Sequence, residues 1–164
     1  GIRFFKEAKV GAVKLEGGVR IAPQIQALVS AGIPVMGHLG LTPQSVHALG
    51  GFKVQGRGED AERIKDDARS LVAAGVFAIV LELVPAELAA EISAELPVPI
   101  IGIGAGNGCD AQVLVWTDLM GLTKNPPKFA KAYVDIRSTM KDAAIAWKSD
   151  VEGVKFPSES ETFH

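Results

Sequence analysis

The sequence has 164 residues, 48% hydrophobic and 22% charged, so it can bury one substantial core and lacks the composition of a disordered chain. Its 17 Lys and Arg against 19 Asp and Glu give a formal net charge of -2, and no apolar run approaches the roughly 20 residues of a membrane span, which argues against nucleic-acid or membrane partners. The single cysteine, Cys109, excludes an intrachain disulfide and a cysteine-based zinc site, and it fits a reducing cytoplasm.

The chain opens without the features of a natural N-terminus. Gly1 has no preceding Met, no basic or apolar leader pattern follows it, and Ile2 to Lys9 already has the pattern of a helix. We therefore expect an internal start, which processing, truncation or absent residues would each produce.

Strand-like apolar runs alternate with amphipathic helical stretches, which indicates the α/β class with parallel strands. The first strand is expected at Ala12 to Glu16, and a helix follows from about Arg20 to Ala31 and ends at Gly32. The second strand is expected at Ile33 to Gly37. A long glycine-rich loop separates it from a helix at Glu59 to Ala74, and loops of that length are usually functional.

The second half of the chain continues the alternation. A third strand is expected at Ala78 to Leu83, a helix at Pro85 to Leu96 and a fourth strand at Pro99 to Ile103. The apolar segment Val113 to Trp116 is expected to be a fifth strand, and the last helices to run from about Pro127 to Glu152.

Five such units are either an open doubly wound sheet or part of a (β/α)₈ barrel. The site residues favour the barrel. We take residues 1–164 as one domain, in which the helices and tail of residues 127–164 lie on the surface or dock on a neighbour.

Two charged side chains share one face of the first strand. Lys14 and Glu16 point to one side, whereas Val13 and Leu15 point to the other, because strand side chains alternate. Burial of a Lys and a Glu is costly unless they meet each other, a metal or a charged ligand. Either a structural ion pair or a site at the end of a barrel strand explains the pattern.

Two further strand ends carry groups that suit catalysis. Glu82 has mostly apolar neighbours and would lose part of its hydration, a setting that suits a general base, although a bond to the following loop or helix start is an equal alternative. His38 follows the second strand between glycines that let the backbone approach a ligand closely, and its alternative role is a structural donor. His47 and His164 have no such setting and are taken as surface residues.

Other motifs are excluded. The glycine run from Gly102 to Gly108 fits G-x-G-x-x-G in neither register, so a dinucleotide site is not expected. The sequence contains no P-loop, no G-x-S-x-G elbow and no H-E-x-x-H helix.

Five blocks of this sequence resemble the ketopantoate hydroxymethyltransferase family, and they occur in the family's order and spacing over essentially the whole chain. The blocks are Val13 to Gly18, Gly37 to Ser45, Gly51 to Gly58, Leu81 to Pro85 and Ile101 to Gly106. Several long blocks in order are far more specific than any single short motif above.

The resemblance implies a Mg²⁺-dependent enzyme built on a (β/α)₈ TIM barrel, with the five strands found here as the fourth to eighth. It implies transfer of a hydroxymethyl group from 5,10-methylenetetrahydrofolate to the keto acid 3-methyl-2-oxobutanoate, with Mg²⁺ chelated by the keto acid. By motif, Glu16 is a metal-site carboxylate, Lys14 and His38 contact the keto acid, and Glu82 is the general base. It also implies a large cyclic homo-oligomer, commonly a decamer, with exchanged C-terminal segments.

The sequence departs from the family at its front. The family supplies an Asp-Ser pair and another Asp from earlier strands, and none of these is in the sequence, so a chain limited to these residues is expected to have little or no activity. Two alternatives remain open: a related barrel lyase acting on phosphoenolpyruvate or oxaloacetate, and an inactive fragment that serves as an oligomerisation module.

Overall fold

The structure, a computed structural model, describes residues 1–45 and 51–164. It divides into two compact units, residues 1–113 and 114–164, and each is described by itself. His47 lies outside the described residues, so its expected surface position stays a prediction.

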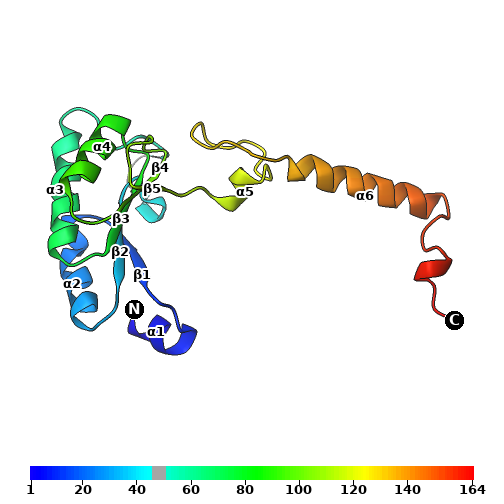
Figure 1. The fold of residues 1–164 in the computed structure, drawn as a ribbon, viewed down its shortest axis with the longest axis horizontal. Coiled ribbons are helices and arrows are strands. Elements are labelled where there is room, and N and C mark those ends of the chain that lie inside the picture. Colours follow the sequence, from blue (N-terminus) through cyan, green and yellow to red (C-terminus); the bar gives the residue numbers. More distant parts are fainter. Residues whose placement is uncertain (46–50) are drawn as a thin grey trace. The chain divides into compact units, whose positions relative to one another are not determined.

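The first unit contains a five-stranded parallel sheet in which strand order follows chain order (Figure 1). Its strands are β1 (Val13–Glu16), β2 (Val35–Gly40), β3 (Ala78–Glu82), β4 (Ile100–Ile103) and β5 (Ala111–Gln112). A doubly wound sheet reverses its strand order at a switch point, whereas a barrel adds each strand beside the last. The expected α/β class is confirmed, and the sheet is consistent with a barrel family.

Short helices precede and connect the strands. They are α1 (Ile2–Ala8), the 3₁₀ turn η1 (Val19–Ile21), α2 (Ala22–Ser30), η2 (Pro43–Ser45), α3 (Asp60–Ala73) and α4 (Ala86–Glu95). The crossover helices α2, α3 and α4 lie along one face of the sheet (Figure 1). The opposite face of the sheet carries every second side chain of each strand.

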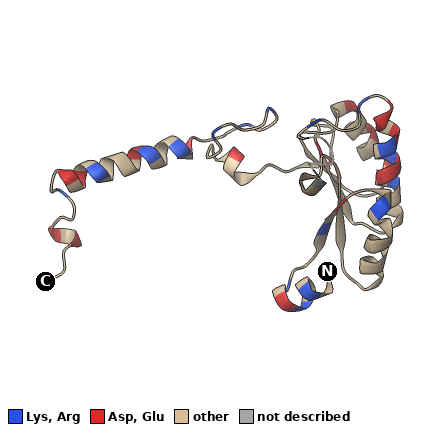
Figure 2. Ribbon diagram, turned by 180° about the vertical axis from the view of Figure 1, so that it is seen from behind, with Lys and Arg blue, Asp and Glu red and all other residues tan. Residues whose placement is uncertain are grey.

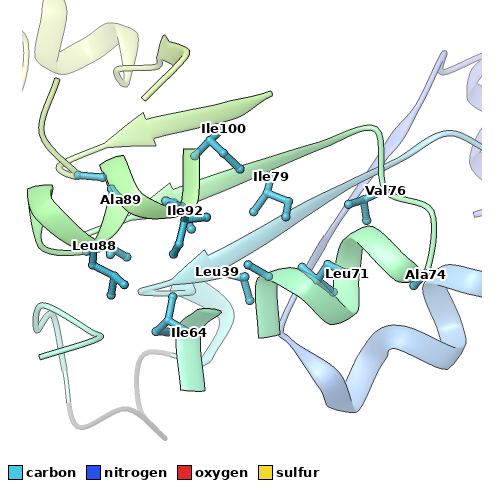
Figure 3. Close-up of a cluster of buried hydrophobic side chains, with 14 of the residues drawn as sticks. Leu39, Ile64, Leu71, Ala74, Val76, Ile79, Leu88, Ala89, Ile92 and Ile100 are labelled. Carbon is cyan, nitrogen blue, oxygen red and sulfur yellow. The ribbon is translucent and has the colours of Figure 1, made fainter. Parts of the chain in front are cut away.

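The hydrophobic core fills the space between the sheet and these helices (Figure 3). Leu39 and Ile79 point from the strands toward α3, where Ile64 and Leu71 lie seven residues apart on one helix face. Burial of each such side chain stabilises the unit by roughly 1.5–3 kcal/mol. The core thus fixes which strand positions face the helices and which face the opposite side.

The observed second and fifth strands differ from the expected ones. β2 extends to Gly40, so His38 lies inside the strand rather than after it. The expected fifth strand at Val113 to Trp116 is wrong. β5 pairs with β4 through Ala111 and Gln112, and the Val113 N–H still donates to the Gly102 carbonyl. Because β4 ends at Ile103, the residues after Val113 lie beyond the paired part of β4. A strand in a sheet needs a paired neighbour, and apolar content alone does not supply one.

The second unit contains α5 (Trp116–Leu119), α6 (Ile136–Glu152) and η3 (Glu159–Glu161). The expected helix over residues 127–135 is wrong. Backbone bonds from Tyr133 to Leu119 and from Ile136 to Met120 hold that segment against α5, and Asp135 starts α6 by accepting the Ser138 N–H. Within residues 1–45 and 51–164, no helix is both long enough and apolar enough to cross a bilayer.

Candidate active site

The four candidate residues lie on the sheet face opposite to α2, α3 and α4. In the parallel register Glu16 pairs with His38, and Gly40 pairs with Glu82. Paired positions in a sheet point to the same side, and so do positions two residues apart. Lys14, Glu16, His38 and Glu82 therefore share one face, and their side chains meet.

His38 lies at the centre of this cluster. Its Nδ1 atom is 2.9 Å from Lys14 Nζ and 3.5 Å from Glu16 Oε1, and Lys14 Nζ is 3.7 Å from the same Glu16 oxygen. On the other side of the ring, His38 Nε2 is 3.1 Å from Glu82 Oε2. One imidazole thus stands between two carboxylates that come from β1 and β3.

The two nitrogens of His38 have different environments. A protonated lysine has only donors, so Nδ1 accepts from Lys14 and the hydrogen of a neutral ring resides on Nε2. Within the described ranges, Nε2 is buried and has no partner in hydrogen-bonding geometry, because Glu82 Oε2 is close but poorly aligned. An unsatisfied buried donor costs about 1–3 kcal/mol, which an oxygen of a ligand beside Glu82 would offset.

Glu16 is held in place from a second direction. Its Oε2 atom accepts the backbone N–H of Gln44 at 3.1 Å, while Oε1 faces Lys14 and His38. The Glu16 side chain is only 9% exposed. Gln44 contributes through its backbone, so no sequence pattern indicated this contact.

Backbone bonds on both sides of Glu82 fix the end of β3. The Leu41 N–H donates to the Glu82 carbonyl at 2.8 Å, the Leu83 N–H donates to the Ile103 carbonyl, and the Leu83 carbonyl accepts from Gln55. Leu83 has φ 49°, in the left-handed region that L-residues other than glycine, Asn and Asp seldom occupy. No sequence pattern predicted this backbone conformation.

The glycines around His38 allow close packing of the protein on itself. A Cβ atom at Gly40 would lie 2.2 Å from the Glu82 carbonyl oxygen, and one at Gly37 would lie 2.7 Å from Leu71 Cδ1. β3 and α3 thus approach these backbone positions closely, and the expected approach of a ligand to this backbone stays a prediction.

Glu16 is the candidate metal ligand among the clustered residues. No group of three His, Cys, Asp or Glu side chains suited to a metal ion occurs within residues 1–45 and 51–164. Of the four clustered residues, Glu16 is the carboxylate expected at a metal, and both of its oxygens have protein partners. Mg²⁺ usually takes one or two protein carboxylates and completes its coordination with water and ligand oxygens, so Glu16 would serve as one such ligand.

A cavity of about 260 Å³ lies beside Glu16. Its walls come from the loop after β1, the end of β2 and the first half of α3, including Arg20, Arg63 and Asp67. Lys14, His38 and Glu82 are not among its walls. Of the four clustered residues, only Glu16 therefore borders this cavity.

Comparison with known proteins gives consistent matches over nearly the whole chain. The family model described as ketopantoate hydroxymethyltransferase matches residues 1–159. The 3-methyl-2-oxobutanoate hydroxymethyltransferase of Acidothermus cellulolyticus is 60% identical over 99% of this chain and 60% of its own length. Those of Streptomyces coelicolor and Mycobacterium ulcerans are 57% and 54% identical over 99% and 98% of this chain, and over 56% and 54% of their own lengths. The chain thus spans little more than half the length of these relatives.

Proposed function

Because this chain belongs to the ketopantoate hydroxymethyltransferase family, we propose that the protein transfers a hydroxymethyl group from 5,10-methylenetetrahydrofolate to 3-methyl-2-oxobutanoate. The product is ketopantoate, a precursor of pantothenate and coenzyme A. The observation that carries this proposal is the contact of Lys14, Glu16, His38 and Glu82 across three neighbouring strands.

Glu82 is the proposed general base. Its Oε2 atom lies beside the buried His38 Nε2, so both groups face one position at the strand ends. A keto acid placed there presents its C3 hydrogen to the Glu82 carboxylate, which takes the proton and leaves an enolate. The enolate carbon then forms a C–C bond to the methylene carbon of the folate. Both C–N bonds of that carbon break, water supplies the hydroxyl oxygen, and tetrahydrofolate leaves.

His38 and Lys14 are proposed to bind and orient the keto acid. A neutral His38 offers its Nε2–H to a substrate oxygen, and Lys14 places a positive charge next to the ring and to Glu16. Donors that are fixed before the reaction stabilise the charge that develops on the enolate oxygen without having to reorganise.

Charge balance supports a metal ion as cofactor. With neutral His38, the cluster contains one cation, Lys14, and two anions, Glu16 and Glu82. A 2-oxo acid is itself an anion, so it binds there more favourably together with a cation. We propose Mg²⁺, which prefers oxygen ligands and would stabilise an enolate, with Glu16 as one ligand.

The remaining features follow from family membership and stay proposals. The five strands would be the fourth to eighth of a (β/α)₈ barrel, the protein would act in the cytoplasm, and residues 127–164 would contribute to a homo-oligomer, commonly a decamer. The residues that contact the folate are not assigned.

Exchange of the keto acid's C3 proton with solvent tests the proposal. The full-length protein should release this proton to D₂O in a Mg²⁺-dependent manner, and it should form ketopantoate when the folate is added. Glu82→Gln should bind the keto acid but lose the exchange. Undiminished exchange in Glu82→Gln would remove Glu82 as the base, and turnover of phosphoenolpyruvate or oxaloacetate without folate would indicate the lyase alternative.

A further inference from the structure

One arginine on α3 connects two carboxylates of the same helix. Arg63 Nε and Nη2 donate to the two oxygens of Asp60 at 2.5 and 3.0 Å, and Nη1 donates to Asp67 Oδ2 at 3.2 Å. Charged residues of both signs follow one another along α3 (Figure 2). Asp60, Arg63 and Asp67 lie three and four residues apart, so they form one row on the helix surface.

Each end of this row accepts a backbone N–H from a different loop. Asp67 Oδ1 accepts the Val19 N–H at 2.7 Å, in the loop after β1. Asp60 Oδ2 accepts the Gly56 N–H at 2.8 Å, near the end of the segment that joins β2 to α3. A Cβ atom at Gly18 would lie 1.9 Å from the Asp67 carboxyl group, so this loop runs directly against the Asp67 side chain.

Both attachment points are close in sequence to candidate site residues. Val19 is three residues after Glu16, and the Gly17 N–H between them donates to the His38 carbonyl. Gly56 follows Gln55, whose N–H donates to the carbonyl of Leu83, the residue after Glu82. The row on α3 thus leads at one end to the strand end that carries Glu16 and at the other to the strand end that carries Glu82.

The stabilising effect of these ion pairs on the fold is small. The Arg63 side chain is 52% exposed, and exposed ion pairs contribute about 0–1 kcal/mol. The hydrogen bonds from Arg63 hold the pKa of Asp60 below its ordinary value and orient this carboxylate, whose Oδ2 atom accepts the Gly56 N–H. These ion pairs therefore orient the two loops more than they stabilise the fold.

We infer that Arg63 is a positioning residue of the proposed reaction: by joining Asp60 and Asp67, it fixes the loops that set the strand ends of Glu16 and Glu82. This inference rests on the proposed function and assigns a role to residues outside the cluster.

Arg69 provides a matched control on the same helix. Its Nε and Nη2 donate to the two oxygens of Glu95 at 2.6 and 3.1 Å, and Nη1 donates to Asp66. This arginine has the same number of hydrogen bonds as Arg63 and a similar exposure, 45%. It links α3 to the last residue of α4, and within residues 1–45 and 51–164 its hydrogen bonds go only to these two helices.

The experiment compares Arg63→Met with Arg69→Met in the full-length protein. Thermal unfolding, keto-acid binding, C3-proton exchange and backbone amide exchange are measured for both variants. We expect similar shifts in melting temperature. Only Arg63→Met should accelerate amide exchange at Val19 and Gly56 and reduce C3 exchange, each by a factor of about two to five, as expected for the loss of partly exposed ion pairs. Arg63→Lys should recover part of the loss, because an ammonium group has donors but lacks the planar fork that joins both carboxylates.

The outcomes separate this inference from the proposed function. Equal effects of the two methionine variants on C3 exchange would overturn the positioning role, and so would faster loop amide exchange in Arg63→Met with unchanged substrate binding and C3 exchange. Absence of keto-acid binding and C3 exchange in the unsubstituted protein would instead reject the proposed function, and the positioning role with it.

Discussion

Lys14 Nζ lies 2.9 Å from His38 Nδ1, although the two side chains are both cationic in their protonated forms. The contact is favourable only if the ring is neutral and Nδ1 is an acceptor, because an ammonium group has no lone pair to offer. Lys14 therefore selects the His38 tautomer that has its hydrogen on Nε2, the nitrogen that faces Glu82.

Substitution of Lys14 should remove this selection. We expect ¹⁵N spectra of the unsubstituted protein to show His38 with a protonated Nε2, and Lys14→Met to show a mixture of tautomers with keto-acid binding weakened by about tenfold or more, the loss of a charged hydrogen bond. Lys6→Met, on α1, should change neither property. A proton found on Nδ1 of His38 in the unsubstituted protein would contradict the assignment.

A methyl group at Gly40 should disturb the end of β3. Gly40 has φ 85°, and a Cβ there would lie 2.2 Å from the Glu82 carbonyl oxygen and 2.7 Å from Val84 Cγ2. We expect Gly40→Ala to lower the free energy of unfolding by at least about 2 kcal/mol, through backbone strain and overpacking, and to lower C3 exchange in the fraction that folds.

Gly32→Ala is the control that measures the cost of left-handed backbone strain without overpacking. Gly32 also has a positive φ, 79°, but a Cβ there would meet nothing within 4 Å. Its substitution should cost only about 1 kcal/mol, the strain of a left-handed alanine. Urea unfolding of both variants measures the difference, and equal losses would show that the contact with Glu82 is unimportant.

Much of the candidate site was predictable because a strand has a simple period. Alternation alone placed Lys14 and Glu16 on one face, and sequential parallel strands then brought Glu16 beside His38. The five motif blocks indicated the family, and the comparisons confirm it. These inferences depend on local pattern or on long sequence blocks, both of which a single sequence contains.

Features that depend on partners distant in sequence were not predictable. The segment Val113 to Trp116 has strand-like residues, but its pairing depends on where β4 ends. In the sequence, the row of Asp60, Arg63 and Asp67 looks like an ordinary solvated helix face. Its role depends on the Val19 and Gly56 N–H groups, which come from other parts of the chain. The left-handed Leu83 is likewise imposed by neighbouring backbone and not by its own side chain.

The stability contributed by Asp110 should depend on pH. The Ile100 N–H and the Ser93 hydroxyl both donate to its carboxylate at 2.8 Å, and they hold its pKa below the ordinary value of 3.8. A carboxyl group whose pKa is lower in the folded state contributes stability that is fully present above the unfolded-state pKa and is lost as pH falls through the folded-state pKa. Asp110 thus stabilises the fold at neutral pH, and this contribution declines as pH falls below 3.8 and is lost once pH falls below the folded-state pKa.

Urea midpoints of Asp110→Asn and the unsubstituted protein measure this effect. The variant should have a lower urea midpoint at neutral pH, and the gap between the two midpoints should narrow as pH falls below 3.8. Ser93→Ala should show a smaller gap with the same trend, because the Ile100 N–H still donates to Asp110. A gap that stays constant with pH would show that the ionised carboxylate is not the source of the stability.

The conformation of Leu83, rather than its side chain, should matter for Glu82. Backbone bonds to Leu41, Ile103 and Gln55 hold the peptide groups on either side of Leu83, so the chain accepts φ 49° there at a cost of about 1–2 kcal/mol. Glycine adopts this conformation without strain, although it also adds freedom to the unfolded chain. A β-branched residue adopts it least readily.

Leu83→Gly should therefore fold with a stability within about 1 kcal/mol of the unsubstituted protein and keep C3-proton exchange. Leu83→Val should be less stable and should lose exchange, because relief of its strain rotates the peptide that Glu82 shares with Leu83. Thermal unfolding and C3 exchange of the two variants give the comparison. If Leu83→Gly folds normally but loses exchange, the Leu83 side chain itself supports Glu82, and the backbone argument fails.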